Sequence, residues 1–248
     1  MEKPNPGNAL ITGSSRGIGR AITLALAQTG YNIAINYLKN EDAAIKVQKE
    51  VSHFGIKSRI FQADVRKADS VEQLISSVER EFGGLEILIN NVGDFIQKSL
   101  SDLSVVEWNN MLASNLSSVF YCCKSVLEGM KQRNFGRIIN IALAGVSHIQ
   151  AYQKITAYAI AKTGVLILTK SLAIETAKYG ITVNAISPGH IKKEDVADNL
   201  IQNRYLEQIP AGHLGSAEDV ANAVLYLVGD KAKYVTGTNI IVSGGWGI

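Results

Sequence analysis

The sequence has few of the residues that form covalent or metal cross-links. Its 248 residues include two cysteines, four histidines and four prolines. The cysteines, Cys122 and Cys123, are adjacent, so they cannot join distant segments, and no other cysteine is present for a thiolate zinc site. We therefore expect no metal site, and two buried or half-buried thiols in a reducing compartment.

The sequence also lacks a strong charge of one sign and long hydrophobic runs. It has 25 Lys and Arg against 22 Asp and Glu, a net charge of +3, which is too mild for a dedicated nucleic-acid-binding protein. No charge-free apolar run approaches the roughly 20 residues that span a bilayer, and residues 1–7 contain no signal-peptide core. We expect a cytoplasmic protein with no nucleic-acid or membrane partner.

What the sequence does contain is a regular alternation of short apolar runs and helical patterns. Seven runs predict strands buried on both faces of a parallel sheet, at 9–12, 33–37, 58–63, 87–90, 137–142, 182–186 and 239–242. Helices are predicted between them, at 17–29, 41–54, 70–82, 105–133, 156–179 and 217–229. This alternation indicates a doubly wound α/β fold with helices on both faces of the sheet, and nothing marks a second domain within 1–248.

A glycine-rich loop directly follows the first predicted strand and leads into a helix. Its glycines, Gly13, Gly17 and Gly19, allow unusual dihedral angles and a close approach of backbone N–H groups to a pyrophosphate. The start of the following helix adds partial positive charge. The segment therefore predicts a dinucleotide-binding loop, made of Gly13, Ser14, Ser15, Arg16, Gly17, Ile18 and Gly19.

The spacing Gly-x-x-x-Gly-x-Gly, with further motifs in order along the chain, resembles the short-chain dehydrogenase/reductase family. These motifs are Asp64-Val65, Asn90-Asn91-Val92-Gly93, Asn115, Tyr158-x-x-x-Lys162, Pro188-Gly189 and Ser243-Gly244-Gly245. Within this family, the sequence is most similar to the 3-oxoacyl-(acyl carrier protein) reductase subgroup. The resemblance implies a single-domain Rossmann-like fold in which further residues contact a nicotinamide cofactor, namely Asp64, Val65, Asn91, Val92, Gly93, Pro188, Gly189 and Ile191.

The end of the second predicted strand indicates which nicotinamide cofactor binds. In NAD enzymes of this fold a carboxylate there binds the ribose hydroxyls, but this strand ends at Tyr37 without one. Glu41 and Asp42 follow Asn40, a plausible N-cap, and are better explained as the first turn of a helix. Arg16 and Lys39 remain to pair with a 2′-phosphate, so NADPH is favoured over NADH, with Tyr37 and Lys39 added to the cofactor site.

Tyr158 and Lys162 are the candidate catalytic pair. They are four residues apart in a helical pattern, so their side chains share one face, and an ammonium near a phenol lowers its pKa. The resemblance implies that Tyr158 protonates a substrate carbonyl while hydride leaves the cofactor, and that Lys162 holds the nicotinamide ribose. It also implies that Asn115 orders a water leading to Lys162; alternatively, Asn115 merely bends its helix.

The sequence departs from the family where the fifth strand ends. A serine that binds the substrate carbonyl is usual there, whereas this chain has Leu143, and the loop to Tyr158 is longer by a couple of residues. Removing one such donor typically costs about 10²–10³ in rate. Three interpretations remain open: Ser147 replaces the donor, Tyr158 and Lys162 suffice, or the protein binds NADPH as a sensor or partner subunit with impaired catalysis. His148 is a further candidate substrate contact.

A second departure follows Pro188-Gly189, where His190 to Asp195 form a strongly charged segment. Lys192 and Lys193 are either a solvated loop face or an attraction for an anionic substrate, such as a phosphopantetheine-linked acyl group. Residues from about 190 to 210 are expected to form a substrate lid. The resemblance also implies a homotetramer or dimer through the helices at 105–133 and 156–179, with Cys122 and Cys123 near the interface.

Overall fold

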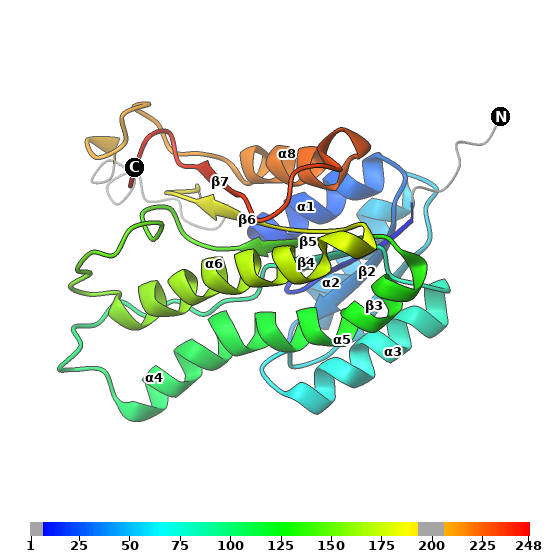
Figure 1. Cartoon of the computed structure of the whole chain (residues 1–248), viewed down its shortest axis with the longest axis horizontal. Coiled ribbons are helices and arrows are strands. Elements are labelled where there is room, and N and C mark those ends of the chain that lie inside the picture. The colour runs from blue at the N-terminus through cyan, green and yellow to red at the C-terminus, as the bar shows by residue number, and fades with distance from the viewer. Residues whose placement is uncertain (1–6, 193–205) are drawn as a thin grey trace.

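A seven-stranded parallel sheet forms the centre of the computed structural model, which describes residues 7–192 and 206–248 (Figure 1). The strands lie in the order β3-β2-β1-β4-β5-β6-β7. Their bounds are Asn8–Ile11 (β1), Asn32–Tyr37 (β2), Ser58–Gln62 (β3), Ile87–Asn90 (β4), Gly136–Ile141 (β5), Ile181–Pro188 (β6) and Asn239–Val242 (β7). The predicted strands agree with these bounds to within two residues at each end.

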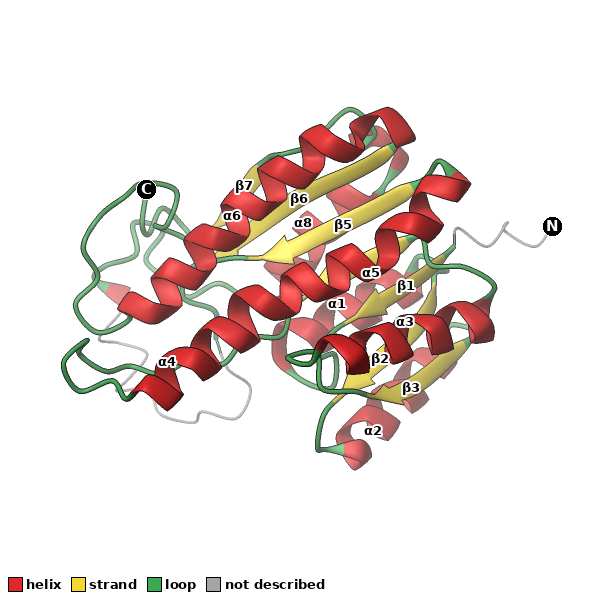
Figure 2. Cartoon of the chain, turned by 60° about the horizontal axis from the view of Figure 1, so that its bottom comes forward, coloured by secondary structure: helices red, strands yellow, loops and turns green. Residues whose placement is uncertain are grey.

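Helices cover both faces of the sheet, which confirms the doubly wound fold (Figure 2). One face is covered by α1 (Gly17–Gln28), α2 (Glu41–Ser52) and α8 (Ala217–Val228). The other is covered by α3 (Ala68–Phe82), α5 (Ser118–Arg133) and α6 (Thr156–Thr176). The shorter helices are α4 (Val105–Leu112), η1 (Ala113–Ser117), η2 (Ala177–Tyr179) and η3 (Asp230–Ala232).

The apolar runs are continuous because each central strand is buried on both faces. In β1, Leu10 packs with the α3, α5 and α6 side, whereas Ala9 and Ile11 pack with the α1, α2 and α8 side. Successive strand residues point to opposite faces, so a strand between two helical layers needs apolar side chains at every position. The register between strands then places their carboxyl ends at one edge of the sheet.

The prediction of one continuous helix over 105–133 is wrong, because this helix is interrupted in the structure. The α-helical turns of α4 and α5 are separated by η1, a π-helical segment. Within it, Asn115 Nδ2 donates to Met111 O at 3.1 Å and also to Asp94 O, outside the helix, at 2.8 Å. A side chain that competes for backbone carbonyls locally widens a helix, and such π turns are frequent at functional sites.

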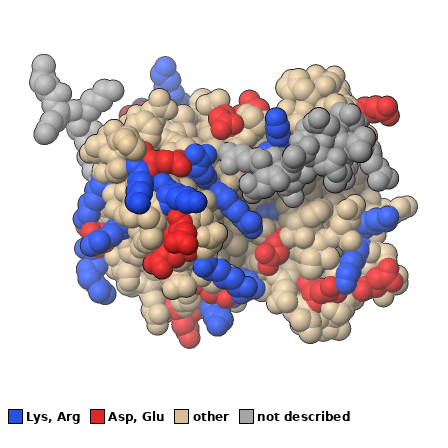
Figure 3. All heavy atoms as spheres, turned by 180° about the vertical axis from the view of Figure 1, so that it is seen from behind, with Lys and Arg blue, Asp and Glu red and all other residues tan. Residues whose placement is uncertain are grey.

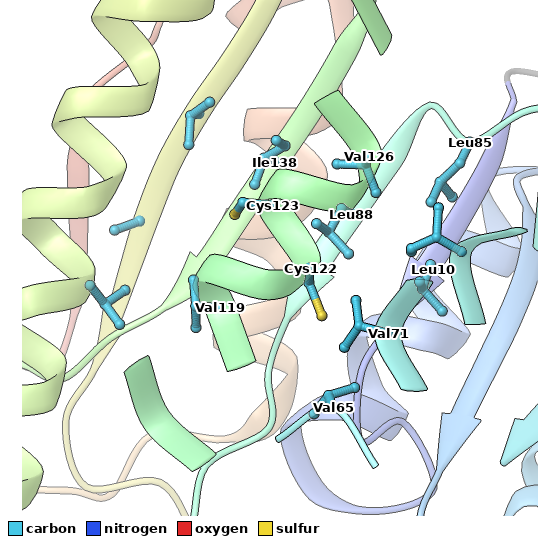
Figure 4. Packing of buried hydrophobic residues seen from close by; sticks show 14 of the residues in the cluster. Leu10, Val65, Val71, Leu85, Leu88, Val119, Cys122, Cys123, Val126 and Ile138 are labelled. Carbon is cyan, nitrogen blue, oxygen red and sulfur yellow. The ribbon is translucent and has the colours of Figure 1, made fainter. Parts of the chain in front are cut away.

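Both cysteines lie in the core between α5 and the sheet (Figure 4). Cys122 lies near Val71 of α3, and Cys123 lies near Ile138 of β5. Burial raises the pKa of the Cys122 thiol to about 12 and raises that of Cys123 as well. The prediction of buried thiols is confirmed, whereas their expected place near a subunit interface stays a prediction.

One helix, Thr156–Tyr179, is long and apolar enough to cross a membrane by length and composition alone. Its mean hydropathy is 1.4, and 44% of its most apolar window is buried inside the molecule. Core helices of soluble proteins meet the same criterion, and this helix packs against β6 and α5 as part of the sheet's cover.

The face of the molecule opposite to the one seen in Figure 1 carries charges of both signs (Figure 3). Lys and Arg side chains stand among Asp and Glu side chains in this view. The described residues also form ion pairs. Arg20 of α1 bonds Glu50 of α2 at 2.6 Å, and Lys57 lies 3.0 Å from Glu81. The small positive excess is therefore interspersed with negative charge on this face.

Candidate active site

The candidate site lies at the edge of the sheet where the parallel strands end. The arrowhead of β5 points to the end of the molecule where α4 and the start of α6 lie (Figure 2). The loops after β1, β2, β3, β4, β5 and β6 also meet at this edge, because all strands run the same way. This is the edge at which open α/β sheets bind their ligands.

The glycine loop after β1 is held in place by side chains from neighbouring strands. Asn91 Nδ2 donates to Thr12 O and Gly13 O, both at 3.1 Å. Asn36 of β2 accepts from Gly13 N at 3.2 Å. At Gly19 a Cβ would lie 2.4 Å from Gly13 O, so only glycine lets α1 pack this closely against the loop.

The start of α1 has the properties of an anion-binding site. Its N-cap residue, Arg16, makes no capping hydrogen bond with its side chain, and the first turn contains no acidic residue. Gly13 and Gly17 have φ values of 62° and 51°, which favour glycine. The uncapped N–H groups of the first turn and the space left by the glycines fit the pyrophosphate of a dinucleotide.

The end of β2 carries no carboxylate, in agreement with the sequence. Asn40 caps α2 by accepting from Ala43 N at 2.9 Å, with Glu41 and Asp42 in the first turn, as predicted. The hydroxyl of Tyr37 donates to Glu41 Oε1 at 3.0 Å, which engages that carboxylate within the protein. Both Arg16 and Lys39 are exposed.

Asp64, at the end of β3, is paired with a residue that the sequence analysis missed. Arg66 donates to Asp64 through Nε and Nη2, both at 2.8 Å, and this pairing lowers the pKa of the carboxyl. Asp64, Val65 and Arg66 line a pocket beside the glycine loop. The pocket residues are Gly13, Asn36, Leu38, Ala63, Asp64, Val65, Arg66, Val92, Asp94 and Ser114.

The segment after β4 joins the glycine loop to the candidate catalytic helix. Asn91 turns toward Gly13, as described, and Val92 lines the pocket. At Gly93 a Cβ would lie 2.3 Å from Asn115 Oδ1 and 3.3 Å from Lys162 Nζ. Glycine is therefore required at position 93 for Asn115 and Lys162 to approach the loop.

Tyr158 and Lys162 lie in the first half of α6, four residues apart as predicted. Lys162 is 2% exposed, its Nζ donates to Ile141 O at 2.8 Å and lies 5.5 Å from the centre of the Tyr158 ring. Burial lowers the pKa of Lys162 to about 8. Burial also raises the pKa of Tyr158 to about 12, so the expected lowering of this pKa is wrong for this arrangement, in which desolvation decides the direction.

Asn115 is fully buried in η1, and its amide oxygen has no hydrogen-bond partner among the described residues. Its amide nitrogen is bound to Asp94 O and Met111 O, which fixes the oxygen beside Gly93. Lys162 Nζ lies near the same glycine. An unsatisfied buried acceptor next to a buried ammonium is the environment that holds an ordered water.

The loop after β5 places the three candidate substrate residues differently. Leu143 is half-buried and packs against the core on the α5 and α6 side. Ser147 is exposed, and its hydroxyl accepts from Asn239 Nδ2 of β7 at 3.1 Å. His148 is exposed. The hydroxyl of Ser147, the candidate replacement donor, is therefore held toward β7 as a hydrogen-bond acceptor.

The segment after β6 is described only as far as Lys192. Gly189 lies against Ser243, and Gly189 N donates to Val242 O at 2.9 Å, which joins the Pro188-Gly189 turn to β7. Ile191 pairs with Gly215 in an isolated bridge, and Lys192 is exposed. Lys193 and the expected lid up to residue 205 lie outside the described residues.

Besides Arg66, sequence reasoning missed Asn36 and Phe95. Asn36 is a buried polar residue in an otherwise apolar strand, and that irregularity is a usable signal. Phe95 packs its ring edge on Tyr158, with centroids 5.1 Å apart. It lies in an irregular loop, so no periodic pattern could have indicated this contact.

Comparisons with known proteins agree with this geometry. The family model described as Enoyl-(Acyl carrier protein) reductase matches residues 13–247. A 3-oxoacyl-[acyl-carrier-protein] reductase, FabG of Staphylococcus epidermidis, is 40% identical over 96% of this chain and 98% of its own length. Acetoacetyl-CoA reductase of Shinella zoogloeoides is 38% identical, covering 96% and 97%.

A solved structure is similar as well. It is a putative short-chain alcohol dehydrogenase from Sinorhizobium meliloti, with a TM-score of 0.90, 30% identity, and coverage of 96% of this chain and 95% of that one. The fold, the motif order and these relatives agree over nearly the whole chain. The chain therefore belongs to the short-chain dehydrogenase/reductase family of oxidoreductases and is similar to its 3-oxoacyl-(acyl carrier protein) reductases.

Proposed function

We propose that the protein is an NADPH-dependent reductase that acts on a carbonyl substrate, with Tyr158 as the proton donor. The observation that carries this proposal is the meeting of Tyr158, Lys162 and Asn115 at the same sheet edge as an uncapped, glycine-lined helix start. A dinucleotide held at that helix start would have Lys162 as a further partner at the same edge. Chain segments far apart in sequence thus form one continuous site.

The cofactor would be held at both of its ends by residues of this chain. The first turn of α1 would bind the pyrophosphate, Asp64 and Val65 would line the adenine side, and Lys162 would bind the nicotinamide ribose. The backbone of Ile191 would meet the nicotinamide amide. When bound, the cofactor supplies a hydride to the carbonyl carbon.

Reduction of the carbonyl also requires a proton at its oxygen, and Tyr158 would supply it. The raised pKa of Tyr158 keeps its phenol protonated near neutral pH, which is the form that can donate to the developing alkoxide. Asn115 Oδ1 would hold a water that connects Lys162 with solvent, so the phenolate can regain its proton after each turnover. Tyr158 would therefore be in its donating form at neutral pH.

The preference for NADPH rests on charge at the end of β2. A 2′-phosphate would meet no carboxylate on β2 itself, since Glu41 and Asp42 lie in the first turn of α2, and it could pair with the exposed Arg16 and Lys39. Fluorescence titration of the wild type with NADPH and NADH tests this directly, with Arg16→Ala/Lys39→Ala as the variant. Equal affinity for the two cofactors in the wild type would remove the proposed preference.

The substrate class follows the relatives, whose names include 3-oxoacyl-[acyl-carrier-protein] and acetoacetyl-CoA reductases. We propose a 3-oxoacyl thioester as the first candidate. NADPH oxidation should be followed with acetoacetyl thioesters and a panel of ketones, in wild type and Tyr158→Phe. Loss of turnover with retained NADPH binding is the expected result; unchanged turnover in that variant would exclude Tyr158 as the donor.

Leu143 favours a second candidate function, an NADP(H)-binding protein with impaired catalysis that serves as a sensor or partner subunit. A leucine cannot donate to a carbonyl, and the Ser147 hydroxyl is held toward β7 as the acceptor of Asn239 Nδ2. Tight NADPH binding without turnover on any substrate would support this candidate. Robust turnover would eliminate it.

We also propose a homo-oligomer formed through α6, in a cytoplasmic protein. Ile160, Ile167 and Ile174 are spaced seven residues apart along α6 and are 46%, 62% and 84% exposed. Such a stripe is the pattern by which helices of two copies pack together. Light scattering should show a dimer or larger assembly, and Ile167→Glu should dissociate it.

A further inference from the structure

The loop after β4 crosses the start of α6 and is fixed at both of its ends. Near its beginning, Asp94 O accepts from Asn115 Nδ2 at 2.8 Å, and Asp94 N donates to Ser114 Oγ at 3.3 Å. Further along, Lys98 N donates to Lys154 O at 2.8 Å, which joins it to the loop before α6. Phe95 lies between these two attachments, so its backbone is anchored on either side.

The side chain of Phe95 contacts the proposed proton donor. Its ring meets the Tyr158 ring edge to face, with centroids 5.1 Å apart and an interplanar angle of 86°. This is a favourable geometry for an aromatic pair, typically worth about 0.5–1.5 kcal/mol beyond the area buried. Phe95 is nevertheless 57% exposed, so burying its own ring does not account for its position.

Tyr158 has few other means of orientation. Among the described residues its hydroxyl makes no hydrogen bond. Leu143 stands at the position where the family usually has a serine. Lys162 Nζ is bound to Ile141 O and lies 5.5 Å from the ring centre, within the range of a cation–π contact. Among the described residues, Phe95 is therefore the aromatic contact of the phenol ring, opposite in kind to the cationic contact with Lys162.

We propose that Phe95 is a positioning residue for Tyr158, which fixes the phenol ring and shields it from water where the serine hydroxyl is missing. It acts through Tyr158 and does not take part in the chemistry itself. Its importance for turnover rests on the proposed reductase function. Its effect on Tyr158 in the cofactor-free protein does not.

The electrostatic environment of Tyr158 agrees with this role. Burial alone raises the pKa of Tyr158, which is what an apolar cover produces. Among the described residues, the charged groups on the segments that contact it are Lys162 on its own helix, Asp94 and Lys98 on the Phe95 loop, and Lys154 before α6. Removing the Phe95 ring should therefore let water reach the phenol and return its ionisation toward that of a free tyrosine.

The first test is a ¹³C-tyrosine NMR titration of the full cofactor-free chain, with the Tyr158 signal identified by its loss in Tyr158→Phe. The wild-type signal should remain that of a phenol up to about pH 11, whereas in Phe95→Ala the midpoint should fall by about one pH unit. Phe95→Leu, which retains most of the apolar cover, should lie between the two. Phe54→Ala removes an exposed phenylalanine, 43% exposed, at the end of α2 and serves as the matched control.

The second test is kinetic. Phe95→Ala should lower kcat by about 10-fold with little change in KM, because a misoriented donor affects the chemical step more than binding. A Phe95→Ala protein that matches Phe54→Ala in both midpoint and kcat would overturn the proposal. If no variant turns over any substrate, the proposed function fails, while the NMR midpoints still decide whether Phe95 covers Tyr158.

Discussion

The glycine loop after β1 and the loop after β5 lie at the same edge of the sheet, yet they are held in different ways. The glycine loop is fixed by Asn36 and Asn91, which bond its backbone from β2 and from the end of β4. The loop after β5 has a bond within itself, with Gln150 Nε2 donating to Gly145 O at 2.9 Å, and a side-chain bond to β7 through Ser147. Residues 147–151 of that loop are exposed.

This difference reflects what each loop is expected to bind. A pyrophosphate is recognised by backbone N–H groups, so the backbone itself must be rigid and only glycine fits the closest approaches. A substrate is recognised by side chains, which can change without altering the sheet. Two of the departures from the family pattern, Leu143 and the longer loop, accordingly lie in the second region.

The largest expected effect is a gain of activity in the loop after β5. Leu143→Ser restores a hydroxyl at the end of β5 and should raise kcat by about 10²-fold, the usual worth of one donor to a developing oxyanion. Steady-state kinetics with a carbonyl substrate measure the change. Leu143→Ala is the matched control, since it loses the same packing without gaining a hydroxyl, and a serine variant no faster than it would show that the donor does not limit catalysis.

A loss of cofactor binding is expected in the glycine loop. Gly19→Ala places a Cβ 2.4 Å from Gly13 O and 2.6 Å from Asn91 Nδ2, both fixed groups. The resulting strain, about 1–3 kcal/mol, should weaken NADPH binding by roughly 10–100-fold in a fluorescence titration. In Gly129→Ala, the added Cβ meets only the movable ends of Glu79 and Arg133, so unchanged binding is expected there; a similar loss in both variants would count against a rigid loop.

The smallest expected effect is a gain of stability at the reacting centre. Lys162 has a pKa of about 8 in the fold against 10.5 for a free lysine, so its burial opposes folding most strongly below about pH 8. Lys162→Met should therefore raise the free energy of unfolding near neutral pH by about 1 kcal/mol, after the loss of the bond to Ile141 O is deducted, and Tm by about 3 °C.

That gain should depend on pH in a defined direction. Between about pH 8 and pH 10.5 the unfolded chain binds more protons at Lys162 than the folded one, so wild-type stability from this group rises with pH. The advantage of Lys162→Met should shrink over the same interval. Thermal melts of both proteins across this range measure it, and a difference that stays constant with pH would mean that Lys162 is not held in a desolvated site.

Much of the fold could be predicted because the relevant signals are local. The apolar runs gave the strands, the helical periodicity gave the layers, and Asn40 marked the start of α2. A bend at Asn115 was one of the alternatives that the sequence offered, but its π-helical form could not be predicted, since the Asn115 amide also binds a carbonyl of Asp94 that only the folded chain brings near. The same holds for Arg66, whose role depends on how the loop after β3 turns back on Asp64.

The sequence by itself determined the doubly wound sheet, the glycine loop and the pairing of Tyr158 with Lys162 on one helix face, because each depends on spacing along a single segment. Only the tertiary structure decided the direction in which the pKa values of Tyr158 and Lys162 shift, and the contact of Tyr158 with Phe95. Desolvation depends on everything packed around a group. No pattern within one segment records which side chains from distant loops will cover it.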